Sequence, residues 1–246
     1  MKQASILLVE DEPFLREIMA EWLQRVAGQV YTAGDGAEAL NVLAANKIDL
    51  LISDVRMPKM DGIGLLKEMQ DTVGCRTRVL FITGFSDIPL RDAYAMGAEA
   101  VLEKPIKREE LLELAKRSLA AADELWREPP VTGPATKLKI SFDSLASALV
   151  EKRIAFGRRG FCVQLTEAVR EGPLEFALDF KADQRVLSGH GVVRWTAPQE
   201  RQAGLEITHI DDASRAWLIE LIERNKPVAF IPRSTGMEQA PGVKIA

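Results

Sequence analysis

Apolar positions in the first half of the chain follow two different spacings in turn. Short continuous apolar runs, such as SILLVE at residues 5–10, are typical of buried strands, whereas residues 13–27 carry apolar side chains at helical spacing. Further runs of both kinds alternate up to about residue 120. This alternation predicts an α/β domain, with a doubly wound five-stranded parallel sheet covered by helices on both faces.

The second half of the chain, from residue 137, predicts a different architecture. Turn residues separate its β-type segments at a spacing of roughly ten residues, which favours a small antiparallel β-barrel or sheet. Helices are expected to flank it, one at residues 141–153, capped by Asp143 or Ser144, and one at residues 211–225. The β-type segments are RIAFGRRGFCVQL, PLEFALDFKAD, RVLSGHGVVRWTAP and QAGLEITHID.

Residues 107–128 contain no Gly or Pro and predict one long helix between the two halves. Two apolar stripes run along this helix, formed by Leu112, Ala115, Leu119, Ala122 and Trp126, and by Leu111, Leu114, Ser118, Ala121 and Leu125. One stripe should pack on the first sheet. The other needs either the second domain or the same helix of a second copy, so a homodimer through residues 107–128 is one of two expectations.

These patterns divide the chain into four parts. The expected parts are a first domain at 1–121, a helix extension and linker at 122–136, a second domain at 137–226, and a C-terminal tail at 227–246.

Composition and charge exclude several classes of protein. The net charge is −4, and no half of the chain carries the positive excess of a DNA-binding domain. No apolar run reaches the ~20 residues that cross a bilayer, and acids follow the first apolar run too closely for a signal peptide. The two cysteines, Cys75 and Cys162, give no disulfide framework. We therefore expect no DNA partner, no membrane insertion and a cytoplasmic location.

Polar side chains follow the predicted strands of the first domain. The carboxyl ends of parallel strands meet at one edge of a sheet, where ligands bind. Three carboxylates gathered there repel each other unless a cation neutralises them, and a site of hard oxygen ligands suits Mg²⁺. A carboxylate beside such an ion, with a lysine and a hydroxyl nearby, can attack a phosphoryl group. The residues concerned are Glu10, Asp11, Asp54, Thr83 and Lys104.

The first domain resembles the receiver domain of two-component response regulators. The resemblance covers residues 4 to about 121 and rests on LLVEDEP, DVRMPKMDG, FITG and EKP, in this order. It implies that Asp54 accepts a phosphoryl group from a sensor histidine kinase. It also implies that Glu10, Asp11, Asp54 and the backbone carbonyl of Arg56 hold Mg²⁺.

The same resemblance assigns the phosphoryl oxygens to Thr83 and Lys104, and it implies a cis peptide bond between Lys104 and Pro105. The chain departs from the family pattern at one position. Receivers usually have Tyr or Phe three residues before the lysine, and that ring swings inward when the threonine moves. Here the position is Val101, which has no ring, and the bulky Phe85 is expected beside the phosphoryl site.

The second domain resembles a PilZ domain, through GPLEFALDF, GVVRW, TAPQERQ, AGLEIT and the closing helix. PilZ domains bind cyclic di-GMP through an R-x-x-x-R loop and a [D/N]-x-S-x-x-G strand motif. Gly160 aligns with the last glycine of that motif, but Ala155 stands where the acid belongs and Gly157 where the serine belongs. No R-x-x-x-R precedes them in residues 137–154. The resemblance therefore predicts a domain that does not bind the nucleotide.

Two readings of the second domain remain. In the first, residues 157–160 form a turn between strands with solvated Arg158 and Arg159, and the domain acts on an unidentified output protein by protein–protein contact. In the alternative, the two arginines still bind cyclic di-GMP. We expect no enzymatic output, because this half shows no catalytic Ser/His/Asp grouping and no metal-ligand spacing. Its histidines, His190 and His209, are expected to stand alone in strand or turn packing.

Overall fold

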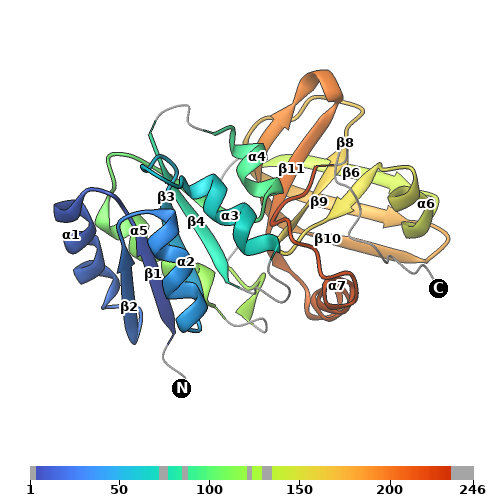
Figure 1. Cartoon of the computed structure of the whole chain (residues 1–246). Helices are drawn as coiled ribbons and strands as arrows, with labels where there is room; N and C mark the ends of the chain where they lie inside the picture. Colours follow the sequence, from blue (N-terminus) through green and yellow to red (C-terminus); the bar gives the residue numbers. More distant parts are fainter. Residues whose placement is uncertain (1–3, 72–76, 85–87, 121–123, 129–134, 234–246) are drawn as a thin grey trace. The chain divides into compact units, whose positions relative to one another are not determined.

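The computed structural model describes residues 4–71, 77–84, 88–120, 124–128 and 135–233 (Figure 1). The chain divides into two compact units, Met1–Ala120 and Ala121–Ala246. Within the described residues, no helix has the length and apolar character needed to cross a membrane.

The first unit is the predicted α/β domain (Figure 1). All its strand pairs are parallel, and the strand order is β2-β1-β3-β4-β5. Its elements are β1 (Ser5–Val9), α1 (Pro13–Leu23), β2 (Gln29–Ala33), α2 (Gly36–Ala45), β3 (Leu50–Asp54), α3 (Gly62–Asp71), β4 (Arg78–Thr83), α4 (Leu90–Ala95), β5 (Ala98–Glu103) and α5 (Arg108–Leu119).

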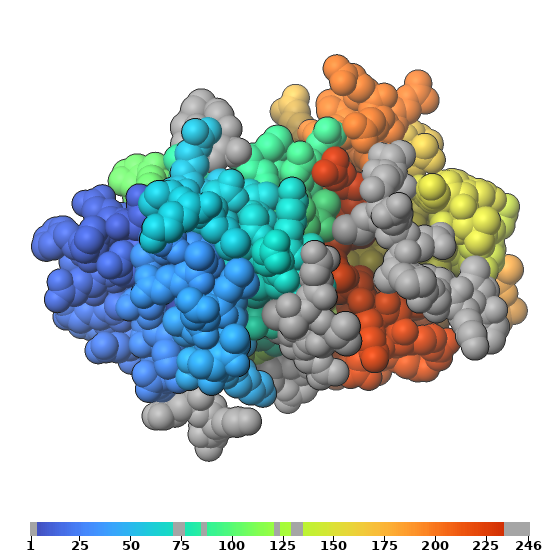
Figure 2. All heavy atoms as spheres, viewed as in Figure 1, coloured from blue at the N-terminus to red at the C-terminus, as the bar shows by residue number. Residues whose placement is uncertain are grey.

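Two apolar clusters cover the two faces of this sheet. Ile6 and Leu8 of β1 pack with residues of α1 and α5, whereas Leu7 and Val9 pack with residues of α2, α3 and α4. On the face seen in Figure 2, side chains of α2 and α3 cover the strands. A strand that is buried on both faces needs an unbroken apolar run, which is why the sequence signal was continuous. Because β1 lies between β2 and β3, the chain changes direction across the sheet at the carboxyl ends of β1 and β3.

The prediction of one long helix at residues 107–128 is wrong. Helix α5 ends at Leu119, and Trp126 has a left-handed backbone with a φ of 57°. Trp126 is 2% exposed in the apolar core of the second unit, where Leu125 packs beside it. Burial of these two side chains outweighs the local helix propensity.

The described members of both apolar stripes pack within the chain. Leu111 and Ala115 are buried against the first sheet, and Leu112, Leu114 and Leu119 pack partly on the same cluster. The homodimer prediction was based on a helix that continues to residue 128, and the structure does not contain that helix. Ala121 and Ala122, one from each stripe, lie outside the described residues.

The second unit is a curled six-stranded sheet, a half-barrel, with a C-terminal helix (Figure 1). The strand order is β6-β9-β10-β11-β8-β7. The expected antiparallel pairing holds for the other four pairs of neighbours, but β6 runs parallel to β9, so the sheet is mixed. Its elements are β6 (Thr136–Phe142), α6 (Leu145–Val150), β7 (Ile154–Phe156), β8 (Gly160–Gln164), β9 (Gly172–Phe180), β10 (Arg185–Ala197), the 3₁₀ turn η2 (Pro198–Glu200), β11 (Gln202–Ile210) and α7 (Asp212–Asn225).

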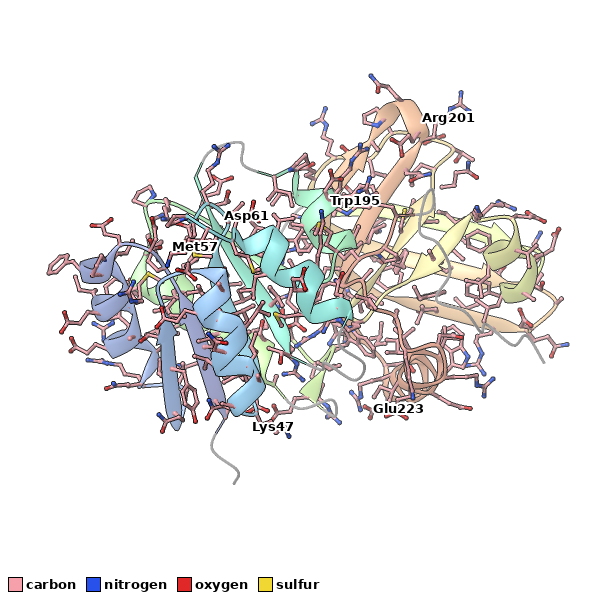
Figure 3. The ribbon with its side chains drawn as sticks, viewed as in Figure 1. Lys47, Met57, Asp61, Trp195, Arg201 and Glu223 are labelled. Carbon is pink, nitrogen blue, oxygen red and sulfur yellow. The ribbon has the colours of Figure 1, made fainter. Side chains whose placement is uncertain are left out.

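The concave face of this sheet holds one apolar core. Phe161 and Phe176 meet there edge to face, with ring centroids 5.3 Å apart, and Leu218 of α7 closes the core. Along β9, core residues alternate with exposed or half-buried ones, as the sequence pattern predicted. Arg201, with a φ of 52°, closes the turn between β10 and β11 (Figure 3).

The two flanking helices are confirmed, with different lengths. Helix α6 covers only Leu145–Val150, and Ser144 caps it by accepting from the backbone N–H of Ser147. Helix α7 begins after Asp211, whose carboxylate accepts from the backbone N–H of Ser214.

Candidate functional site

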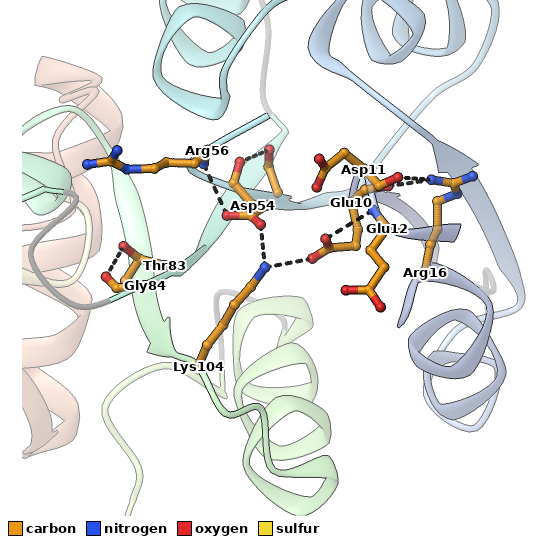
Figure 4. Close-up of polar contacts among 10 residues, drawn as sticks. Glu10, Asp11, Glu12, Arg16, Asp54, Arg56, Thr83, Gly84 and Lys104 are labelled. Atoms are coloured by element: carbon orange, nitrogen blue, oxygen red, sulfur yellow. Dashed lines mark hydrogen bonds and ion pairs between the residues drawn. The ribbon is translucent and has the colours of Figure 1, made fainter. Parts of the chain in front are cut away.

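Two buried carboxylates lie on adjacent strands of the first unit. Glu10 directly follows β1 and is 1% exposed, and Asp54 ends β3 and is 4% exposed. The parallel register pairs Val9 with Ser53, which sets the two acids side by side. Asp11 is exposed, and one carboxylate oxygen from each of the three acids lies within 4.8 Å of the others (Figure 4). The predicted convergence of these side chains is confirmed.

Lys104 reaches this cluster from the end of β5. Its ammonium group forms ion pairs with Asp54 and with Glu10, the latter at 3.2 Å (Figure 4). The backbone N–H of Lys104 donates to the carbonyl of Thr83 at 2.9 Å, which ties the end of β5 to β4. The expected cis peptide bond between Lys104 and Pro105 is present.

Burial and charge shift two groups in the pocket. Burial raises the pKa of Glu10, and the nearby charge of Asp54 raises it further against the opposing effect of Lys104. For Lys104, burial lowers the pKa, but the hydrogen bonds and charges of Asp54 and Glu10 outweigh it, so the pKa is raised. Lys104 is thus held as an ammonium ion, paired with the carboxylates of Asp54 and Glu10.

Both oxygens of Asp54 have partners. Oδ1 accepts from the backbone N–H of Arg56 at 3.1 Å, and Oδ2 accepts from Lys104. Thr83 ends the neighbouring strand β4 and is 5% exposed, with its hydroxyl donating to the carbonyl of Gly84 at 2.8 Å. The metal role of the Arg56 carbonyl stays a prediction, and Phe85 lies outside the described residues.

Arg16 is a site neighbour that the sequence reasoning missed. From α1, its guanidinium donates to the backbone carbonyl of Glu10 and, at 3.4 Å, to that of Asp11 (Figure 4). These bonds fix the backbone of the two residues whose carboxylates enter the pocket. The sequence shows only an arginine on the first helix, about one turn after the acidic pair. Its role becomes clear once the fold shows that this side chain reaches back to the carbonyl groups of residues 10 and 11.

Val101 lies on β5 and packs partly buried on the cluster beneath α2, α3 and α4. Its short side chain fills a packing position and has no ring to rotate.

In the second unit, residues 157–160 form the predicted turn between β7 and β8. The N–H of Gly157 donates to the carbonyl of Gly160 at 2.8 Å. The expectation that both arginines are solvated is wrong for Arg159, which is 7% exposed. Its carbonyl accepts from the N–H of Ile207 at 3.0 Å.

The chain's own residues 228–232 lie against this turn. The backbone N–H groups of Arg158 and Arg159 donate to carbonyl oxygens of this segment at 2.9 and 3.2 Å, and the Arg158 Nε donates to a third at 3.1 Å. A Cβ atom on Gly157 would lie 2.4 Å from the carbonyl oxygen of Phe230. Glycine is therefore needed at 157 for the close approach of this segment.

The histidines do not stand alone, contrary to expectation. His190 of β10 and His209 of β11 are directly paired, with ring centroids 6.2 Å apart. Cys162 is buried, and its thiol donates to Oε1 of Gln202 at 3.8 Å, whereas Cys75 lies outside the described residues.

Comparison with known families identifies the first unit. The family model described as the response regulator receiver domain matches residues 6–116. These residues are a response regulator receiver domain. The acidic pocket of this receiver domain, with Glu10, Asp11 and Asp54, is of the kind typical of a Mg²⁺ site. The match ends before the half-barrel, so the resemblance of the second unit to PilZ domains stays a prediction.

Known proteins are similar to this chain over about half of its length. The transcriptional regulatory protein GlrR of Escherichia coli (strain K12) is 38% identical over 146 residues, which are 56% of this chain and 32% of GlrR. The transcriptional regulatory protein CrdR of Helicobacter pylori is 34% identical over 116 residues, covering 47% and 54%. The chain thus spans about a third to a half of these relatives.

A solved structure of a putative response regulator from Chloroflexus aurantiacus is 32% identical, with a TM-score of 0.45, and the match covers 49% of this chain and all of that one.

Proposed function

We propose that this chain is a response regulator that receives a phosphoryl group on Asp54 from a sensor histidine kinase. The observation that carries the proposal is the convergence of three carboxylates within 4.8 Å, with Lys104 paired to Asp54. The family match supports it for residues 6–116, and the chain spans only about a third to a half of its relatives.

The donor set fits Mg²⁺. Carboxylate oxygens from three residues lie close enough to share one ion, and hard oxygen ligands are those that Mg²⁺ prefers. Glu10, Asp11 and Asp54 would hold the ion, together with the backbone carbonyl of Arg56. When bound, the ion neutralises the charge that builds up on the transferred group.

The chain's own residues supply the rest of the chemistry. The Asp54 carboxylate attacks phosphorus of the kinase phosphohistidine, so that a P–O bond forms while the P–N bond breaks and its electron pair returns to the imidazole nitrogen. Lys104 turns its ammonium group from the Asp54 carboxylate to a phosphoryl oxygen. Thr83, whose hydroxyl now donates to a backbone carbonyl, donates to a second phosphoryl oxygen.

For the second unit we propose a PilZ-like module that acts by contact with an output protein, without enzymatic activity. Ala155 and Gly157 supply no side-chain hydrogen bonds to a nucleotide, and the backbone of Arg158 and Arg159 is bonded to residues 228–232. The alternative, cyclic di-GMP binding through the two arginines, would need that segment to leave the turn.

The test of the receiver proposal uses the full chain, acetyl phosphate and Mg²⁺, followed by intact mass. Wild type should gain one phosphoryl group, and Asp54→Asn should gain none. Asp61→Asn is the matched control, because Asp61 is exposed and its side chain caps α3 by accepting from the Gly64 N–H, which Asn can still do.

Chelation of Mg²⁺ should abolish labelling of both wild type and control. Labelling of Asp54→Asn at the wild-type rate would contradict the assignment of Asp54 as the phosphoryl acceptor.

A further inference from the structure

Two histidines face each other on the outer side of the half-barrel. His190 of β10 and His209 of β11 are opposite each other in the antiparallel register, with ring centroids 6.2 Å apart and ring planes at 57°. Both side chains are half-buried. Core residues Leu187 and Val193 occupy the alternate positions of β10, so His190 points away from the apolar core.

The hydrogen bond of His209 leaves its second nitrogen available. Nδ1 of His209 lies 3.1 Å from the backbone carbonyl oxygen of Glu128. A carbonyl only accepts, so Nδ1 carries the hydrogen of this bond. In the neutral ring, Nε2 then keeps its lone pair. A backbone carbonyl that orients an imidazole in this way is the usual outer partner of a metal-binding histidine.

A carboxylate extends the row by one strand. Glu175 of β9 is opposite His190 in the register, and its neighbours Leu174 and Phe176 belong to the core, so Glu175 lies on the same outer side as the two rings. Its side chain is 51% exposed and lies 3.6 Å from Lys137, which is also exposed. An exposed ion pair of this kind holds a side chain only weakly, so the carboxylate can turn toward His190.

The two rings need only a small adjustment to share an ion, whereas the Glu175 carboxylate has to turn toward them from Lys137. Two imidazoles that share a tetrahedral zinc ion through Nε2 have ring centroids about 5 Å apart, given the usual Zn–N distances. A change of roughly 1 Å lies within the reach of side-chain rotation. The register also shifts between His190 and Gly191, and such bulges re-aim side chains. A Cβ on Gly191 would lie 2.3 Å from the carbonyl oxygen of Glu206, so glycine permits this bulge.

We propose that His190, His209 and Glu175 form a binding site for a divalent transition metal, with Zn²⁺ as its best match. Two imidazoles and one carboxylate are a donor set that proteins use for Zn²⁺. The set differs from the all-oxygen pocket at Asp54, so the two sites select different ions. The proposal stands independently of phosphorylation.

Calorimetric titration of the untagged full chain with ZnCl₂, in excess Mg²⁺ to occupy the acidic pocket, tests the site. Wild type should bind one Zn²⁺, with an affinity that His190→Ala and His209→Ala each reduce by at least about tenfold. Glu175→Gln should weaken binding less. Asp54→Asn and Cys75→Ser are controls that should bind as wild type does.

Proton NMR gives a second measurement that a folding defect in a variant cannot imitate. The chain has 2 histidines, so its imidazole signals report on this pair alone. Zn²⁺ should move both sets of signals together in wild type, and Mg²⁺ should move neither. Absence of saturable binding, a shift of only one ring, or unchanged affinity in both histidine variants would overturn the proposal.

Discussion

At the scale of single residues, the receiver pocket depends on side chains that do no chemistry. Arg16 donates to the backbone carbonyls of both Glu10 and Asp11, and thereby orients two carboxylates that would bind Mg²⁺. Two effects of removing Arg16 oppose each other. Loss of a nearby positive charge should strengthen cation binding, whereas loss of the backbone contacts should weaken it.

We predict that the positioning effect is the larger. Arg16→Ala should raise the Kd for Mg²⁺ about tenfold, measured by calorimetry on the full chain. Arg25→Ala, which removes an exposed positive charge beyond the end of α1, should leave the Kd unchanged. Tighter binding by Arg16→Ala would mean that the residue acts through its charge alone.

At the scale of elements, helix ends follow from side chains that local sequence identifies. Asp211 caps α7, accepting from the backbone N–H of Ser214 at 2.9 Å and from its hydroxyl at 2.6 Å. These hydrogen bonds hold the pKa of Asp211 below its usual range. The contribution to stability is therefore complete above the ordinary pKa of an aspartate, and it is lost as the pH falls through the lowered value.

The cap can be tested by substitution. Asp211→Ala should destabilise the protein by about 1 kcal/mol near neutral pH, and the difference from wild type should shrink on acidification. Asp211→Ser keeps a side-chain acceptor and should stay close to wild type. Thermal unfolding followed by circular dichroism measures both, and a full-sized Asp211→Ala difference at pH about 2 would contradict the carboxylate's role.

At the scale of the whole molecule, we propose that the chain responds to one signal, phosphorylation of the receiver, and not to cyclic di-GMP. The segment at 228–232 lies on the β7–β8 turn that the alternative function would need. Charge-assisted hydrogen bonds contribute about 1.5–3 kcal/mol each, so losing several such bonds weakens binding by orders of magnitude.

Calorimetry with cyclic di-GMP should accordingly give no binding at micromolar concentration, for the full chain alone and with beryllofluoride and Mg²⁺. A chain that binds at micromolar Kd, and loses binding in Arg158→Ala or Arg159→Ala, would instead be a sensor of both phosphate and nucleotide. Lys152→Ala serves as a matched control, because it removes an exposed positive charge outside the turn.

The receiver fold and the acidic and basic members of its pocket could be predicted from the sequence. Continuous apolar runs mark strands that are buried on both faces, and few connections between parallel strands are possible. Once the strands are parallel, the positions of Glu10, Asp54 and Lys104 directly after or at strand ends bring them together. The start of α7 at Asp211 could also be predicted from the sequence, because a helix cap depends on only a few neighbouring residues.

Three features could not be predicted without the folded structure: the end of α5, the burial of Arg159, and the pairing of His190 with His209. Each depends on contacts between residues distant in sequence, whose energies outweigh local propensity. Helical spacing continued past Leu119, but the core of the second unit takes Trp126 out of a helix. The histidines fall on different strands, and only the register of β10 with β11 places one ring opposite the other.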